Sequence, residues 1–100
     1  MILATLLAAA QPPGMTDEAW EMLRARIESA PQAVATFIER RTVCNDIRRD
    51  PRRDPALAAR LQTQHRCASV AHDGQALYRA YRSRPRILQL LRETETLRGW

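Results

Sequence analysis

Residues 34–55 read VATFIERRTVCNDIRRDPRRDP, and this stretch decides the fold. Its first half carries apolar side chains at helical spacing, which predicts a helix from about residue 31 to residue 49. Its second half repeats Arg-Arg-Asp-Pro, and the residue before each proline is pushed out of the helical region. The repeat therefore predicts a turn-rich connection, after which Asp54 caps and Pro55 begins the next helix.

Helical spacing continues on the N-terminal side of this stretch. Thr16 is placed to cap a helix that Pro31 ends, with Asp17 and Glu18 at the positive end of its dipole. Ser29 is expected to cap the helix that follows.

On the C-terminal side, apolar spacing predicts a third helix that starts at Pro55 and continues to Tyr81. A break or kink is expected at Gly74, because glycine costs about 1 kcal/mol inside a helix. Asp73 is placed to cap a new start there. The leucine-rich residues 87–97 predict the last helix.

The composition fits one small helical domain. The chain has 100 residues, 45% hydrophobic and 27% charged, with a formal net charge of +5. Its three glycines and 5% of aromatic residues disfavour a barrel or sandwich of many short strands. We therefore expect an all-α fold, a small bundle of four or five helices. The domain would cover residues 16–98, preceded by a linker at 11–15.

The first ten residues, MILATLLAAA, are uncharged, apolar and end in small side chains. Such a run before a proline-rich break is typical of a secretory signal, with cleavage before Gln11. The basic residue that usually precedes the apolar core is missing, and a short helix packed on the domain is the alternative. The run is too short to span a bilayer. We expect a periplasmic or secreted protein without a transmembrane span.

Cys44 and Cys67 are the only cysteines, and they lie on or beside the apolar faces of consecutive predicted helices. Antiparallel helices would bring them together, so we expect one disulfide in an oxidising compartment. Two reduced thiols in a cytosolic protein are the alternative. A zinc site that adds His65 and His72 is disfavoured, because the spacings match no standard zinc motif. We expect no metal and no other cofactor.

All sixteen basic residues are arginine, which fits the codon bias of a GC-rich genome. A dense subset is expected to contact an anion or a protein partner: Arg40, Arg48, Arg49, Arg52 and Arg53. Nucleic acid is possible but not favoured, because few aromatic residues interleave with these arginines and acidic residues are interspersed among them.

Arg41 lies near the middle of the apolar face of its predicted helix. Its stem is expected to lie along the edge of the core with the charge in water. The alternative is a structural ion pair with Glu39, Asp46 or a carboxylate on another helix.

No Gly-x-Ser-x-Gly, His-Glu-x-x-His or phosphate-binding glycine loop occurs in the sequence. Neither histidine has a nucleophile at a spacing typical of a catalytic pair. We therefore expect a protein that acts by binding and is not an enzyme.

Residues 39–45, with the pattern Glu-Arg-Arg-x-x-Cys-Asn, are followed by a second cysteine and a Leu/Arg-rich end. Together they resemble short, uncharacterised exported helical proteins of GC-rich bacteria. The resemblance covers about residues 37–91 and implies export and a disulfide, with no known activity. In those proteins an Asn-His-aromatic run follows the first cysteine, whereas this chain has Asp46 and Ile47 after Asn45.

A fainter similarity, at Leu77-x-x-x-Tyr81 after the second cysteine, is to lysozyme-inhibitor-like periplasmic domains. The leading expectation is an exported helical protein that binds an anionic or protein partner. An intracellular arginine-rich nucleic-acid-binding or regulatory protein and a lysozyme-inhibitor-like protein are the alternatives.

Overall fold

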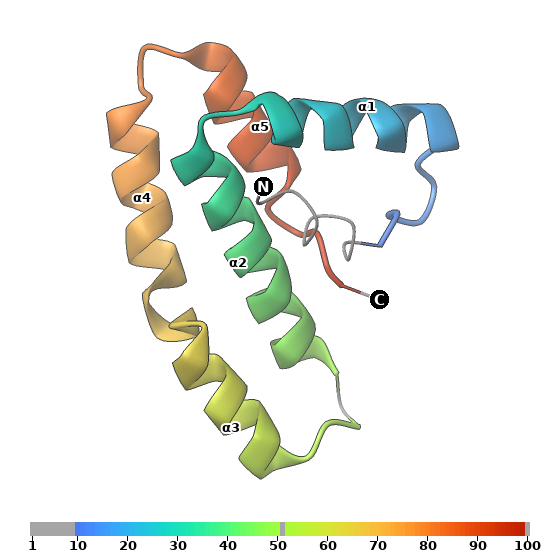
Figure 1. Cartoon of the computed structure of the whole chain (residues 1–100), viewed down its shortest axis with the longest axis vertical. Coiled ribbons are helices and arrows are strands. Elements are labelled where there is room, and N and C mark those ends of the chain that lie inside the picture. Colours follow the sequence, from blue (N-terminus) through green and yellow to red (C-terminus); the bar gives the residue numbers. More distant parts are fainter. Residues whose placement is uncertain (1–9, 51, 100) are drawn as a thin grey trace.

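Helix α2 (Gln32–Arg49) lies at the centre of the computed structural model, which describes residues 10–50 and 52–99 (Figure 1). It contacts every other helical element of these described ranges. These are α1 (Asp17–Ser29), α3 (Pro55–Gln64), the short 3-10 helix η2 (Cys67–Ser69), α4 (Val70–Ala80) and α5 (Pro85–Glu93). The described residues contain no β-strand, so the expected all-α bundle is confirmed.

The core forms where α1 and α5 cover the N-terminal half of α2. Side chains at helical spacing on α2 meet the apolar stripes of the two other helices, as the sequence pattern predicts. The buried cluster contains Trp20, Leu23, Ile27, Val34, Ala35, Phe37, Ile38, Ile87, Leu90, Leu91 and Leu97. Leu97 reaches this core from the turn after α5, because that helix ends at Glu93.

The starts of α1 and α3 follow the predicted capping. Thr16 Oγ1 accepts a hydrogen bond of 3.1 Å from Ala19 N, and Asp54 Oδ2 accepts one of 3.3 Å from Leu57 N. The predicted cap at Ser29 is wrong. Ser29 is the last residue of α1, and its hydroxyl donates to a carbonyl within that helix.

The arm formed by α3, η2 and α4 runs antiparallel to α2 and bends in the middle (Figure 1). The predicted break at Gly74 is wrong, because the bend lies at His65–Ser69 and Gly74 is inside α4. At the bend, Arg66 has left-handed backbone angles with φ +52°. Gly74 allows close packing instead, since a Cβ at this position would lie 3.1 Å from Phe37 Cζ.

The residues expected to form a linker, 11–15, are held against the domain. Gln11 Nε2 donates to Met15 O at 2.7 Å and to Asp17 Oδ1 at 3.0 Å, and Met15 packs on the core. Ala10 N donates to Arg98 O at 3.0 Å. The rest of the expected signal segment, residues 1–9, lies outside the described residues.

Candidate functional site: a groove beside a buried arginine

Arg41 projects from the middle of α2 to the end of α5 and is only 6% exposed. Its Nη2 donates to Leu91 O at 2.7 Å and to Thr94 Oγ1 at 2.9 Å. Its guanidinium carbon lies 5.0 Å from the centre of the Phe37 ring, which is within cation–π distance. The cation therefore binds the C-terminal end of α5, where the helix dipole is negative.

The charge of Arg41 forms no ion pair with a described residue. Its Nε is buried and has no acceptor within the described part of the chain. Burial lowers the pKa of Arg41, and the nearby Tyr78 hydroxyl and Glu95 carboxylate offset part of that effect. Arg41 is thus buried instead of reaching water, and its hydrogen bonds go to neutral atoms instead of to the carboxylate of an ion pair.

Arg40, the next residue, extends from α2 to the bend of the arm and binds it. Its Nε donates to His65 O and its Nη2 to Arg66 O, each at 2.9 Å. The same Nη2 lies 3.0 Å from Ser69 Oγ and 2.8 Å from Asp73 Oδ2. One guanidinium therefore satisfies carbonyls at the end of α3 and a carboxylate in the first turn of α4.

The predicted disulfide is confirmed, and it closes the same region. Cys44 on α2 is bonded to Cys67, and their Cα atoms lie 5.6 Å apart. Cys67 belongs to η2 and not to the end of α3, so the bond fixes the bend of the arm against α2. With both sulfurs in this bond, the zinc alternative has no thiolate ligand.

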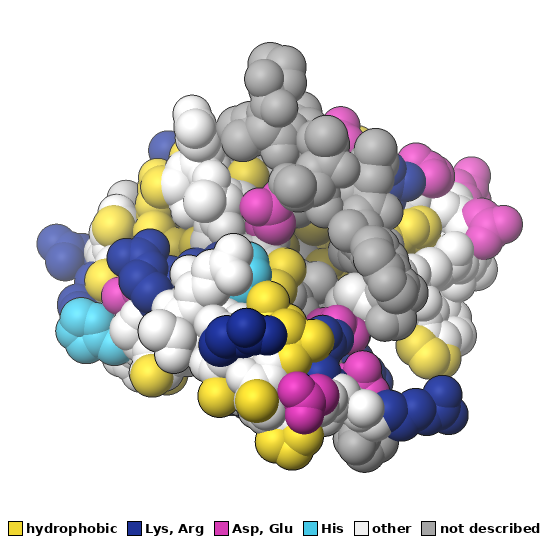
Figure 2. Space-filling view, turned by 60° about the horizontal axis from the view of Figure 1, so that its bottom comes forward, with side chains coloured by type: hydrophobic (Ala, Val, Ile, Leu, Met, Phe, Trp, Pro, Cys, Tyr) yellow, Lys and Arg dark blue, Asp and Glu magenta, His cyan; other side chains and the backbone are white. Residues whose placement is uncertain are grey.

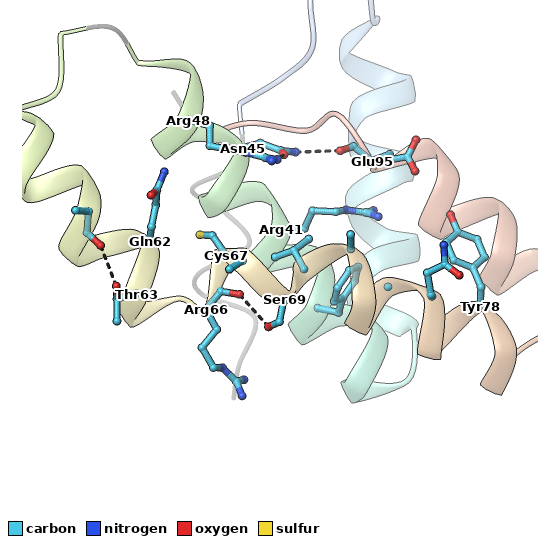
Figure 3. Close-up of a pocket in the computed structure, with 17 residues that line it drawn as sticks. Arg41, Asn45, Arg48, Gln62, Thr63, Arg66, Cys67, Ser69, Tyr78 and Glu95 are labelled. Atoms are coloured by element: carbon cyan, nitrogen blue, oxygen red, sulfur yellow. Dashed lines mark hydrogen bonds between the residues drawn. The ribbon is translucent and has the colours of Figure 1, made fainter.

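Beside Arg41, α2 and the arm form an open groove of about 1060 Å³, here called the α2–α4 groove (Figure 3). Phe37, Val70 and Gly74 line its middle, and Cys67 lines it next to the bend. Ala68, Ser69 and Ala71 also line this middle part with small side chains, and Ala59 lines the groove on α3.

Polar side chains gather at the two ends of the α2–α4 groove. Toward α5 the lining includes Arg41, Tyr78 and Glu95, and in Figure 3 the Tyr78 ring extends its hydroxyl toward the same end as the Arg41 guanidinium. Toward α3 the lining includes Asn45 and Arg48, together with amide and hydroxyl groups of the arm.

The contacts of Asn45 hold the segment after α5 against α2. Its Nδ2 donates to Glu95 O and to Leu97 O, each at 2.9 Å, and its Oδ1 accepts from Arg48 Nη2 at 2.9 Å. The segment after α5 is thereby held as one wall of the groove, and Arg48 is held at its rim.

The charged residues that line the groove are mostly basic. They are Arg41, Arg48, Arg66 and Glu95, although the side chain of Arg66 points away from the other two arginines in Figure 3. A groove with an apolar middle and this balance of charge suits a ligand that is anionic and partly apolar.

The predicted arginine cluster does not form one surface. Arg40 is occupied at the bend, and Arg53 donates to Asp46 Oδ2 at 3.1 Å and lies 3.7 Å from Asp50 Oδ2. Arg49 and Arg52 are exposed. In the space-filling view, arginine side chains lie among acidic and hydrophobic ones (Figure 2). Of the cluster, Arg48 alone lines the groove.

Three residues of this region were not predicted from the sequence: Thr94, Tyr78 and Glu95. The position of Arg41 on an apolar stripe was the available signal, because a buried guanidinium requires acceptors. The sequence did not indicate that the acceptors would come from the end of α5.

Comparisons of the chain with protein-family models, with curated proteins and with solved structures found no match. Among the described residues, no helix is both long and apolar enough to cross a membrane. The chemistry of the α2–α4 groove is therefore the basis for a functional assignment.

Proposed function

We propose that this chain is a small exported binding protein that holds an anionic partner in the α2–α4 groove and catalyses no reaction. The observation that carries the proposal is the buried charge of Arg41, whose hydrogen bonds go to neutral acceptors at the groove wall. Buried charges in proteins are normally compensated. An anion in the groove would supply the missing negative charge.

The disulfide supports the exported part of the proposal. Disulfides persist in oxidising compartments and are rare in reducing ones, so Cys44–Cys67 is compatible with the periplasm or the extracellular medium. The apolar residues 1–10 would direct export as a signal segment.

Anion binding is tested by titrating the folded protein with acetate and, separately, with a short acidic peptide, followed by NMR. Signals of the groove residues Arg41, Gln75 and Tyr78 should shift, while signals of the exposed face of α1, such as Ala25, should not. Glu95→Gln removes the carboxylate at the site and should strengthen the binding of both probes. The proposal is wrong if no anionic probe shifts the groove signals, or if the shifts are confined to α1.

Export is tested by the intact mass of the protein isolated from its host. We expect a periplasmic or secreted species that lacks residues 1–10 and weighs two hydrogens less than the reduced chain. A full-length, reduced species in the cytosol, with a DNA affinity that falls steeply with salt, would instead support the intracellular nucleic-acid-binding alternative.

A further inference from the structure

The middle of the α2–α4 groove indicates what kind of anion it holds. Between its polar ends, the wall on the arm consists of small or apolar residues, with Ala71 and Ala68 between Gly74 and Cys67. No charged side chain lies on this part of the wall among the described lining residues. A ligand that lies along this wall should therefore carry an apolar portion beside its charge.

The dimensions favour a small ligand over a macromolecule. The groove is open, and its volume of about 1060 Å³ lies just above the usual range for small-molecule sites, so a single-chain ligand would occupy part of it. The lining on α2 extends from Phe37 to Arg48, about 16 Å at 1.5 Å per residue. With carbon–carbon bonds of about 1.5 Å, a saturated chain of roughly a dozen carbons has a similar length.

The charge is placed at one end of this channel. The Arg41 guanidinium and the Tyr78 hydroxyl lie toward α5, and the run of small residues extends from there toward the bend. A carboxylate at Arg41 would therefore leave its chain lying along Gly74, Ala71 and the disulfide.

We propose that the α2–α4 groove binds a single-chain carboxylic acid, a fatty acid of about twelve carbons, with its carboxylate at Arg41 and Tyr78. This inference rests on the proposed anion-binding function and adds the acyl chain to it. The apolar wall binds the chain without directional contacts, and the buried cation selects an ionised head group.

The experiment is isothermal calorimetry of the full disulfide-bonded protein with three probes below micelle-forming concentration: dodecanoate, dodecanol and acetate. Dodecanoate should bind about tenfold or more tightly than dodecanol, because only it can accept charge-assisted hydrogen bonds. It should bind at least about 100-fold more tightly than acetate, because each buried methylene adds affinity.

Variants test whether the probe binds in the α2–α4 groove. Ala71→Trp fills the channel and should abolish dodecanoate binding, whereas Ala25→Trp, on the exposed face of α1, should leave it unchanged. Tyr78→Phe should weaken dodecanoate binding more than dodecanol binding, because the hydrogen bond to a carboxylate is charge-assisted. Glu95→Gln should tighten dodecanoate binding by about two- to five-fold. These variants leave the hydrogen bonds of Arg41 to α5 in place, so they separate binding from folding.

The outcomes distinguish the two proposals. If acetate or an acidic peptide binds in the groove and dodecanoate binds no better than acetate, the acyl-chain inference is overturned while anion binding stands. Equal binding of dodecanoate and dodecanol, or insensitivity to Ala71→Trp, overturns the inference as well. If no anionic probe binds the unmodified protein, both proposals are wrong.

Discussion

The buried guanidinium of Arg41 requires particular hydrogen-bond acceptors from the residues around it. Its Nη2 needs both the carbonyl of Leu91 and the hydroxyl of Thr94, and Thr94 is fully buried. Thr94 Oγ1 in turn donates to Leu90 O at 2.8 Å, so a single hydroxyl joins the guanidinium to the end of α5.

Thr94→Val keeps the shape of the side chain and removes this acceptor. A buried N–H left without a partner costs about 1–3 kcal/mol, so we expect the free energy of unfolding to fall by that amount in urea denaturation. Thr96→Val, at an exposed position two residues further on, is the matched control and should change stability little. Equal effects of the two substitutions would contradict the role given to Thr94.

Gly74 is a second position where the addition of a single side-chain atom would affect the stability of the fold. Helix propensity alone disfavours glycine in α4, yet the ring of Phe37 occupies the space that a side chain would need. We expect Gly74→Val to destabilise the fold by about 1–3 kcal/mol through overpacking, whereas Ala76→Val, exposed on the same helix, should cost less. Thermal unfolding of both variants, followed by circular dichroism, tests the difference.

At the scale of elements, the bend between α3 and α4 depends on one side chain of α2. Arg40→Gln removes the donors to His65 O and Arg66 O. We expect it to lower the free energy of unfolding by about 1–3 kcal/mol and to increase hydrogen exchange at the end of α3. Arg49→Gln, on an exposed arginine of the same helix, is the control.

The Arg40–Asp73 ion pair adds a pH dependence to the same element. The hydrogen bond from Arg40, followed by the one from His72, lowers the pKa of Asp73 below its ordinary value of 3.8. Because the folded-state pKa is the lower one, the stabilisation is present above pH 3.8 and is lost as the pH falls through the folded-state value. The stability difference between the unmodified protein and Asp73→Asn should therefore shrink below pH 3.8, and a constant difference from pH 7 to pH 3 would contradict this account.

The helix boundaries and the bend differ in how well the sequence predicted them. Local signals predicted the starts of α1 and α3, because Thr16 and Asp54 cap their helices with atoms three residues away. The bend was misplaced because its determinants are distant in sequence: Arg40 and Cys44 lie on another helix. Glycine propensity pointed to Gly74, and the packing of Phe37 against it explains why that prediction was wrong.

For the candidate site, the sequence indicated single residues but not their arrangement. Arg41 stood out on its apolar stripe, yet its acceptors come from residues 50 and 53 positions away. The dense arginine cluster was the stronger sequence signal, and the structure divides it between the bend, an acidic network at Asp46 and exposed positions. Tertiary contacts, which spacing does not reveal, decide which arginine faces the groove.

At the scale of the whole molecule, the disulfide connects α2 to the arm, and these two parts form the walls of the α2–α4 groove. It closes a segment with a sequence separation of 23 residues, for which the chain-entropy model gives a stabilisation of about 3 kcal/mol. This is a large part of the roughly 5–15 kcal/mol that stabilises a typical domain.

The double variant Cys44→Ala/Cys67→Ala should therefore have a lower melting temperature than the oxidised protein. The reduced form of the unmodified protein should behave like the variant, and adding reductant to the variant should have no effect. A melting temperature that is unchanged in the variant would contradict a stabilising role for this bond.

The two cysteines also enclose the connection between α2 and α3, in which Arg52 is exposed. A protease that cleaves once after Arg52 would yield two polypeptides still joined through sulfur. The cleaved protein would migrate as one band on a non-reducing gel and as two fragments once reductant is added. The loop is thus a place where new chain ends could be created, or an epitope tag inserted, without the two halves of the molecule drifting apart.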